Sequence, residues 1–114
     1  MQYALLIYLD PDTGSDLSED ERRAVTDEYL AIRDDPRVTA GAHLRPVETA
    51  TTLRVADQQP LITDGPFADT KEIFGGYYLV EADDLDAALE IAGRVPAVRM
   101  GGCVEVRPLM EMPH

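Results

Sequence analysis

The stretch LITDGPFADTKEIFGGYY, residues 61–78, decides how this chain is organised. Its apolar start ends at Thr-Asp-Gly-Pro, residues 63–66, where glycine permits positive φ and proline fixes φ and lacks a backbone donor. The chain must therefore turn there, with Asp64 on the bend. Gly75 and Gly76 then let the following strand approach neighbouring backbone closely. Polar loop residues beside bare backbone predict a site in this stretch.

The residues before this stretch predict a strand, a helix and a second strand. Residues 2–9, QYALLIYL, are apolar at almost every position, which is typical of a strand covered on both faces. Ser18 and Glu21 form a capping box at a helix start. Because a proline disfavours helical geometry in the residue before it, we expect a helix over residues 18–35 and then a strand over residues 38–44.

Each predicted helix carries one apolar stripe. In the first helix, Val25, Tyr29 and Ile32 fall at i, i+4 and i+7. The second helix is capped by Asp83 or Asp84. Its predicted stripe consists of Leu85, Ala88, Leu89 and Ala92. Single stripes of this kind let both helices pack on one sheet.

Two short runs rich in β-forming residues predict an added hairpin. They are residues 51–55 and 61–63, and the five residues between them, 56–60, have the length of a hairpin loop. Since these runs fall between the second main strand and the glycine pair, we expect the hairpin to lie beside the main sheet.

The last strand completes the predicted order. Residues 103–109 place Val104 and Val106 on one face, and we expect Cys103 to be a core residue. The order is β-α-β-(ββ)-β-α-β, a split βαβ arrangement whose right-handed crossovers put both helices on one sheet face. Because the strands over 2–9 and 77–80 are apolar on both faces, the opposite face needs a cover, and we expect a homodimer.

Length and charge limit the possible partners. The chain has 114 residues, which suits a single domain over residues 1–114. Its net charge is −12, and no basic stripe offsets it, so nucleic acid and anionic membrane are poor partners and small molecules or proteins are favoured. A single cysteine excludes an internal disulfide, and the first apolar run is too short for a signal sequence or a membrane span. We therefore expect a cytoplasmic protein.

The segment TDGPFADTKE, followed by GGYYLVEADDLDAALEIAGRVP and then VEVRPLME, resembles the YCII-related proteins of the DGPF type. The opening MQYALLIY and the middle ATTLRV fit the same family, so the resemblance covers nearly the whole chain. It implies an α+β fold, a dimeric α+β barrel of ferredoxin-like βαββαβ topology, in a family whose biochemical activity is largely unassigned. Proteins that resemble this one are often encoded beside extracytoplasmic-function sigma factors, which hints at signalling.

Asp64 and His43 are the candidate catalytic residues. A carboxylate held at a strand end beside a turn can act as a general base or orient a histidine, and the alternative is an Asx-type cap of the turn. The broader YCII-related group is thought to be enzymatic through a histidine and an aspartate, which favours Asp64. The first predicted helix contains no histidine, so the usual partner is missing there. His43, in the second strand, could shuttle protons if it faced Asp64, and otherwise it is packed or solvated.

Six further residues are candidate ligand contacts: Asp69, Lys71, Glu72, Tyr8, Tyr78 and Arg99. The charged residues after the turn could orient a polar substrate, although loop charges are commonly solvated. The arginine could bind a carboxylate through two parallel hydrogen bonds. The tyrosines could line a pocket with a hydroxyl at its rim, and their alternative place is the core or the dimer interface. Asp64, His43 and Glu72 could ligate a metal, but nothing in their spacing requires one, and no cofactor is expected.

Missing motifs narrow the possible functions. No Walker loop, dinucleotide fingerprint, G-x-S-x-G elbow or paired-histidine helix is present in the sequence. The first hypothesis is a cofactor-free acid–base enzyme, similar to a lyase or isomerase, acting on a small polar organic molecule in a cleft near Asp64. The second is a ligand-binding or regulatory module linked to sigma-factor signalling. The third is a dimeric interaction domain without a ligand.

Overall fold

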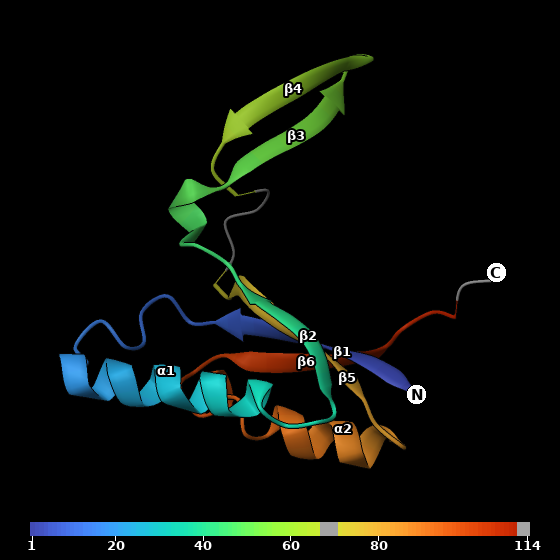
Figure 1. The fold of residues 1–114 in the computed structure, drawn as a ribbon. Helices are drawn as coiled ribbons and strands as arrows, with labels where there is room; N and C mark the ends of the chain where they lie inside the picture. The colour runs from blue at the N-terminus through green and yellow to red at the C-terminus, as the bar shows by residue number, and fades with distance from the viewer. Residues whose placement is uncertain (67–70, 112–114) are drawn as a thin grey trace.

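A four-stranded antiparallel sheet with both helices on one face forms the body of the molecule (Figure 1). The computed structural model describes residues 1–66 and 71–111. The strands lie in the order β2-β5-β1-β6, which are Val38–His43, Ile73–Glu81, Gln2–Leu9 and Cys103–Pro108. The helices are α1, Glu19–Arg33, and α2, Leu85–Ala92. This is a ferredoxin-like α+β arrangement, so the fold predicted for the single chain is confirmed.

The core lies between the sheet and the helices, and the other side of the sheet is uncovered. Because side chains alternate along a strand, Tyr3, Leu5 and Ile7 of β1 face the helices and are buried. The residues between them face the other way and pair with alternate residues of β5. We call this second side the open face. Its apolar and aromatic members on β1, β2 and β5 are Ala4, Leu6, Tyr8, Ala40, Ala42, Phe74, Tyr77 and Leu79.

Helix α1 begins and packs as predicted. The Ser18 hydroxyl accepts a hydrogen bond from the backbone N–H of Glu21 at 3.1 Å, and the Glu21 carboxylate accepts one from the N–H of Ser18 at 3.2 Å. The predicted stripe is the least exposed side of the helix: Val25, Tyr29 and Ile32. The helix ends at Arg33 rather than at residue 35, because the N–H of Asp34 caps it in a tighter turn.

The apolar stripe predicted for the second helix is partly wrong, as the buried residues of α2 show. Its cap is Asp84, which accepts a hydrogen bond from the N–H of Ala87. The buried residues are Ala88, Ile91 and Ala92, whereas Leu85 and Leu89 stay half exposed. The two alanines allow a close approach to the sheet, so the branched Ile91 enters the core in place of the leucines. No helix in the described part of the chain is long and apolar enough to cross a membrane.

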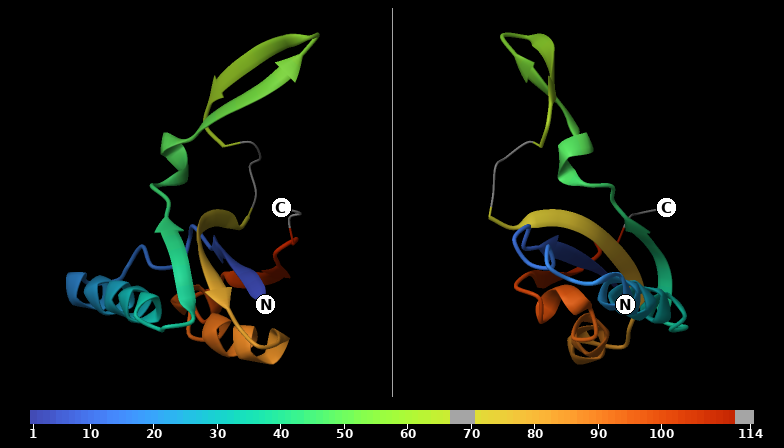
Figure 2. Two further views of the ribbon diagram at one scale, coloured as in Figure 1. Left: turned by 45° about the vertical axis from the view of Figure 1, so that its right-hand side comes forward. Right: turned by 90° about the vertical axis from the view of Figure 1, so that its left-hand side faces the viewer.

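The predicted hairpin forms a separate sheet. Its strands are β3, Thr51–Ala56, and β4, Gln59–Asp64. They stand away from the body on the side opposite the helices in every view, so the predicted position beside the main sheet is wrong (Figure 2). The five-residue loop is also wrong, because Asp57 and Gln58 adopt positive φ of 51° and 66° and form a two-residue turn. Pro60 belongs to β4 and lies opposite Val55. This is a non-hydrogen-bonded pair of the ladder, so the missing N–H of proline costs no hydrogen bond there.

The close backbone approach predicted for the glycine pair is confirmed. Gly76 pairs with His43, and a Cβ atom on Gly76 would lie 2.5 Å from the carbonyl oxygen of Ala42. No side chain larger than hydrogen fits there without moving a strand. Gly75 lies at the irregularity where the register of β5 with β1 shifts, so the glycine pair lies within β5 and not before it.

Cys103 is exposed, so its predicted core position is wrong. Val104 and Val106 pack against the helix-side core, and strand alternation therefore turns Cys103 to the open face. Its thiol lies 3.3 Å from a carboxylate oxygen of Glu72. Partial shielding of this thiol from water, and next its hydrogen bond with the Glu72 carboxylate, raise the pKa of Cys103, so the thiol stays protonated near neutral pH.

Candidate functional site

A groove runs between α1 and the part of the sheet that contains β2. It consists of an inner cavity of about 130 Å³ and an outer cavity of about 430 Å³. Both cavities are lined by Leu9, Thr26, Tyr29 and His43, so they are two parts of one groove. The inner part lies over β1, β2 and β5, and the outer part extends to the loop after β1 and the segment after β2.

His43 and Tyr29 form the wall that the two cavities share. His43 is the last residue of β2, and Tyr29 comes from the sheet-facing stripe of α1. Their ring centroids are 6.4 Å apart and their planes are 14° from parallel. Burial raises the pKa of the Tyr29 hydroxyl, and a backbone hydrogen bond with Ala97 partly opposes this shift. A neutral phenol therefore stands beside an exposed imidazole.

Tyr78 lines the inner cavity and fixes α1 on the sheet. Its ring is buried, and its hydroxyl donates a hydrogen bond to the carbonyl oxygen of Tyr29 at 2.9 Å. Burial raises the pKa of Tyr78, and the nearby charge of Arg33 opposes this shift. The hydrogen bond ties β5 directly to the helix residue that stacks on His43, so the width of the groove is held at this point.

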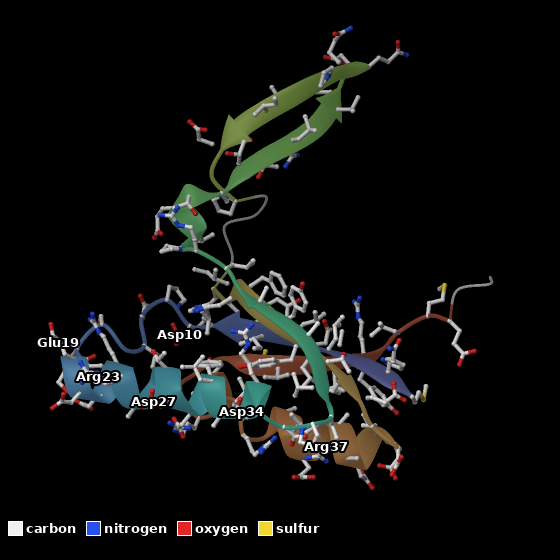
Figure 3. All side chains as sticks on the ribbon, viewed as in Figure 1. Asp10, Glu19, Arg23, Asp27, Asp34 and Arg37 are labelled. Carbon is white, nitrogen blue, oxygen red and sulfur yellow. The ribbon has the colours of Figure 1, made fainter. Side chains whose placement is uncertain are left out.

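Charged side chains of opposite sign line the two cavities. Arg33 lines the inner cavity and forms no ion pair with residues 1–66 or 71–111. Asp10 and Glu48 line the outer cavity, and Figure 3 shows Asp10 at the exit of β1, above α1. Among the described residues, no group of three or more His, Cys, Asp or Glu side chains is placed to hold a metal ion. The groove is therefore positive at its inner end and negative at its outer end.

Asp64 lies outside this groove. It is the last residue of β4 and is exposed, and it lines neither cavity. The turn after it is held by Gly65, whose N–H donates to Ala50 at 2.7 Å and whose carbonyl accepts from the Thr52 hydroxyl at 2.7 Å. Within the described ranges, the Asp64 carboxylate has no hydrogen-bond partner. A single chain does not bring Asp64 and His43 to the same cavity.

The predicted tyrosine and arginine contacts lie at separate places. Tyr78 shares the inner cavity with His43. Tyr8 lies on the open face of the sheet, with its ring centroid 5.6 Å from that of Phe74. Arg99 forms an ion pair with Glu28 of α1, and this hydrogen bond raises the pKa of the Arg99 guanidinium. Arg99 lines neither cavity.

The predicted charged contacts after the turn also lie away from the groove. Lys71 and Glu72 are exposed just before β5 and line neither cavity. Glu72 accepts the hydrogen bond from the Cys103 thiol. Asp69 lies outside the described residues.

Several groove residues were not singled out from the sequence. Thr26, Leu30 and Arg33 stand at i, i+4 and i+7 on α1, immediately beside the buried stripe. The hydroxyl of Thr26 and the guanidinium of Arg33, which flank the apolar stripe, could have indicated a binding site beside the helix. Asp10 and Glu48 had no such signal, because two separate loops meet only after the sheet has formed.

The fold and the groove define a class of protein: a ferredoxin-like α+β domain with a small-molecule-sized groove between its first helix and the sheet. The family model of the YCII-related domain matches residues 1–113. An uncharacterised protein of Rhizobium meliloti (strain 1021) is 37% identical over 115 residues, which cover 96% of this chain and 92% of the relative. The chain belongs to the YCII-related family.

Proposed function

We propose that this chain binds a small organic anion with a flat apolar body in the groove between α1 and β2. The observation that carries this proposal is the stacked pair of His43 and Tyr29 at the junction of the two cavities. The inner cavity, at about 130 Å³, is close to the size that holds one benzene-like ring. An apolar cavity with a few orienting polar groups is typical of small-molecule sites.

Arg33 supports a negative charge on the ligand. Its guanidinium lines an otherwise mostly apolar cavity and makes no ion pair within the described residues. A planar guanidinium binds a carboxylate through two parallel hydrogen bonds. Because the chain carries a net charge of −12, an anion is repelled from most of the surface and attracted only where such a cation dominates.

Cofactor-free acid–base catalysis is the second candidate function, favoured by the place of His43. This imidazole lines both cavities, and imidazoles exchange protons near neutral pH. Asp10 and Glu48 line the outer cavity, which His43 also lines. Turnover of a bound ligand separates this candidate from a regulatory, ligand-sensing role, in which the ligand is released unchanged.

The open face of the sheet supports a homodimer as the form in which the groove operates. Its apolar side chains are only partly buried in the single chain, and Phe74 is exposed. Monomeric proteins rarely leave an apolar surface of this extent in water. A second copy on the open face would cover it and leave the groove accessible, because the groove lies on the helix side.

Benzoate should stabilise the protein more than benzamide at the same concentration. The two probes share a flat ring, but only benzoate carries the charge that Arg33 binds. Thermal unfolding measures the difference, since a ligand at one hundred times its Kd stabilises the native state by about 2.7 kcal/mol. Arg33→Gln should abolish the difference, and Arg23→Gln, on the same helix outside the groove, should keep it (Figure 3). Equal shifts for both probes, or a difference that survives Arg33→Gln, would contradict the proposal.

Light scattering should give about twice the chain mass of 12.6 kDa. Leu6→Lys should yield the monomer, because the variant loses an apolar contact at the centre of the open face and its ammonium, opposite Glu105, must give up its hydration in the interface. Ala24→Lys adds the same charge to an exposed position of α1 and should leave the dimer intact. A monomeric parent protein at micromolar concentration would rule the dimer out.

A further inference from the structure

The β3–β4 hairpin, which we call the arm, has two chemically different faces. The register pairs Leu53 with Ile62 and Val55 with Pro60, and directly opposite residues share a face. The opposite face pairs Thr52 with Thr63. We call the set Leu53, Val55, Pro60 and Ile62 the apolar face of the arm. Its three large side chains are 66%, 72% and 67% exposed for Leu53, Val55 and Ile62, so the apolar face is uncovered within the chain.

The arm extends from the uncovered side of the body. In Figures 1 and 2, the helices cover one side of the four-stranded sheet and the arm projects from the other side. The radius of gyration is 16.2 Å, compared with roughly 13 Å for a compact domain of this length. The chain therefore presents two uncovered apolar surfaces, the open face and the apolar face of the arm, on the same side of the molecule.

The open face and the apolar face of the arm together come closer to the area of a stable dimer interface than the open face alone. Four strands about 4.8 Å apart and six residues long give the open face a footprint of roughly 400 Å². The arm, with two strands of six residues, adds roughly 200 Å². Stable interfaces bury about 800 Å² on each partner, so the open face alone falls well short of this area. With the arm the total is roughly 600 Å², and the surface that receives the arm of the second copy adds roughly 200 Å² more, so each partner reaches about the required area.

We propose that the apolar face of the arm packs against a second copy of this chain, so that the two subunits of the homodimer each clasp the other with an arm. This proposal extends the homodimer proposed above and rests on it. Asp64 lies on the same face as Leu53 and Ile62, because it pairs with Thr51 in the alternating register. Its carboxylate then lies at the subunit boundary, where the second copy can supply the partner that the described residues of its own chain do not.

Neighbouring residues on β4 provide a matched test. Ile62→Lys and Thr63→Lys place the same charge at adjacent positions on opposite faces of the arm. Analytical ultracentrifugation should show the dimer Kd raised at least ~30-fold by Ile62→Lys, since the variant loses an apolar contact and its ammonium, with Asp64 as its neighbour on the same face, must give up its hydration at the interface. Thr63→Lys should change it less than about threefold, as expected for an exposed position. Circular dichroism of both variants reports whether the fold is intact.

A photo-crosslinker in place of Val55 shows directly what the arm touches. Irradiation should give a covalent species of twice the 12.6 kDa chain mass, and fragment mapping should place the second end of the link on the other chain. A dimer that Leu6→Lys disrupts but Ile62→Lys does not would overturn the arm proposal and leave the sheet-face dimer standing. A crosslink confined to one chain, or equal effects of the two β4 variants, would also overturn it.

Discussion

Replacing Leu5 with alanine should lower the free energy of unfolding by about 3–4 kcal/mol, the range for leucines deleted from well-packed cores. Leu5 is 0% exposed at the centre of β1, between β5 and β6, and it belongs to the core cluster that contains Ile32 of α1 and Ile91 of α2. Strands on either side keep the backbone from collapsing into the space left by the lost methyl groups. The cavity therefore persists and adds to the lost transfer free energy.

Leu89→Ala is the matched control for Leu5→Ala. Leu89 lies on α2 and is half exposed, and alanine has the better helix propensity, so the loss should stay below about 1 kcal/mol. Urea unfolding at a fixed protomer concentration measures both variants, because dimerisation makes stability concentration-dependent. A similar loss in the two variants would contradict the core assigned to β1.

Asp35→Asn should destabilise the protein by roughly 2 kcal/mol, the scale of hydrogen bonds to charged groups that are lost together. The Asp35 side chain is only 8% exposed in the turn between α1 and β2. It accepts hydrogen bonds from the Arg37 guanidinium at 2.8 and 3.0 Å and from Arg94 at 2.7 Å. Arg37 also binds Glu90 of α2 at 3.0 Å, so this network ties the end of α1 to α2.

The same network predicts a pH dependence. The hydrogen bonds from Arg37, first from its side chain and then from its backbone, hold the pKa of Asp35 far below its usual range. Because the folded-state pKa lies below the unfolded one, this stabilisation is fully present above the unfolded pKa near 4 and is lost as the pH falls below it. The stability difference between the parent protein and Asp35→Asn should therefore shrink from pH 6 to pH 3.

Asp34→Asn is the control for the network. Asp34 is the neighbouring, exposed carboxylate and forms no side-chain ion pair within the described ranges (Figure 3). Its substitution should change the unfolding free energy by less than about 0.5 kcal/mol at pH 6. An Asp35→Asn deficit that stayed constant between pH 6 and pH 3 would show that its cause is packing and not charge.

Local chemistry made the main elements predictable. A few neighbouring residues are enough to identify the capping box at Ser18, the cap at Asp84 and the continuous apolar run of β1. Together with the order of elements they define the fold. The hairpin loop was mispredicted because Pro60 was taken as a break, although an edge position tolerates its missing N–H.

The site was less predictable, because it depends on which residues meet after folding. His43 and Tyr78 line the same cavity, but Asp64 belongs to the arm and lies outside the groove of its own chain. The motif around the turn marks a conspicuous loop, and its sequence does not encode the direction in which the arm projects. The groove residues of α1, in contrast, follow the helical period and were within reach of sequence reasoning.

The proposed binding site is tested most directly by the ring signals of His43 in an NMR titration with benzoate. The chain contains only two histidines, His43 and His114, so their ring resonances can be assigned from one variant, His114→Gln. We predict a saturable shift of the His43 ring signals with benzoate, a much smaller one with benzamide, and loss of the benzoate effect in Arg33→Gln. Unchanged His43 signals at benzoate concentrations that raise the Tm would contradict the site in the groove.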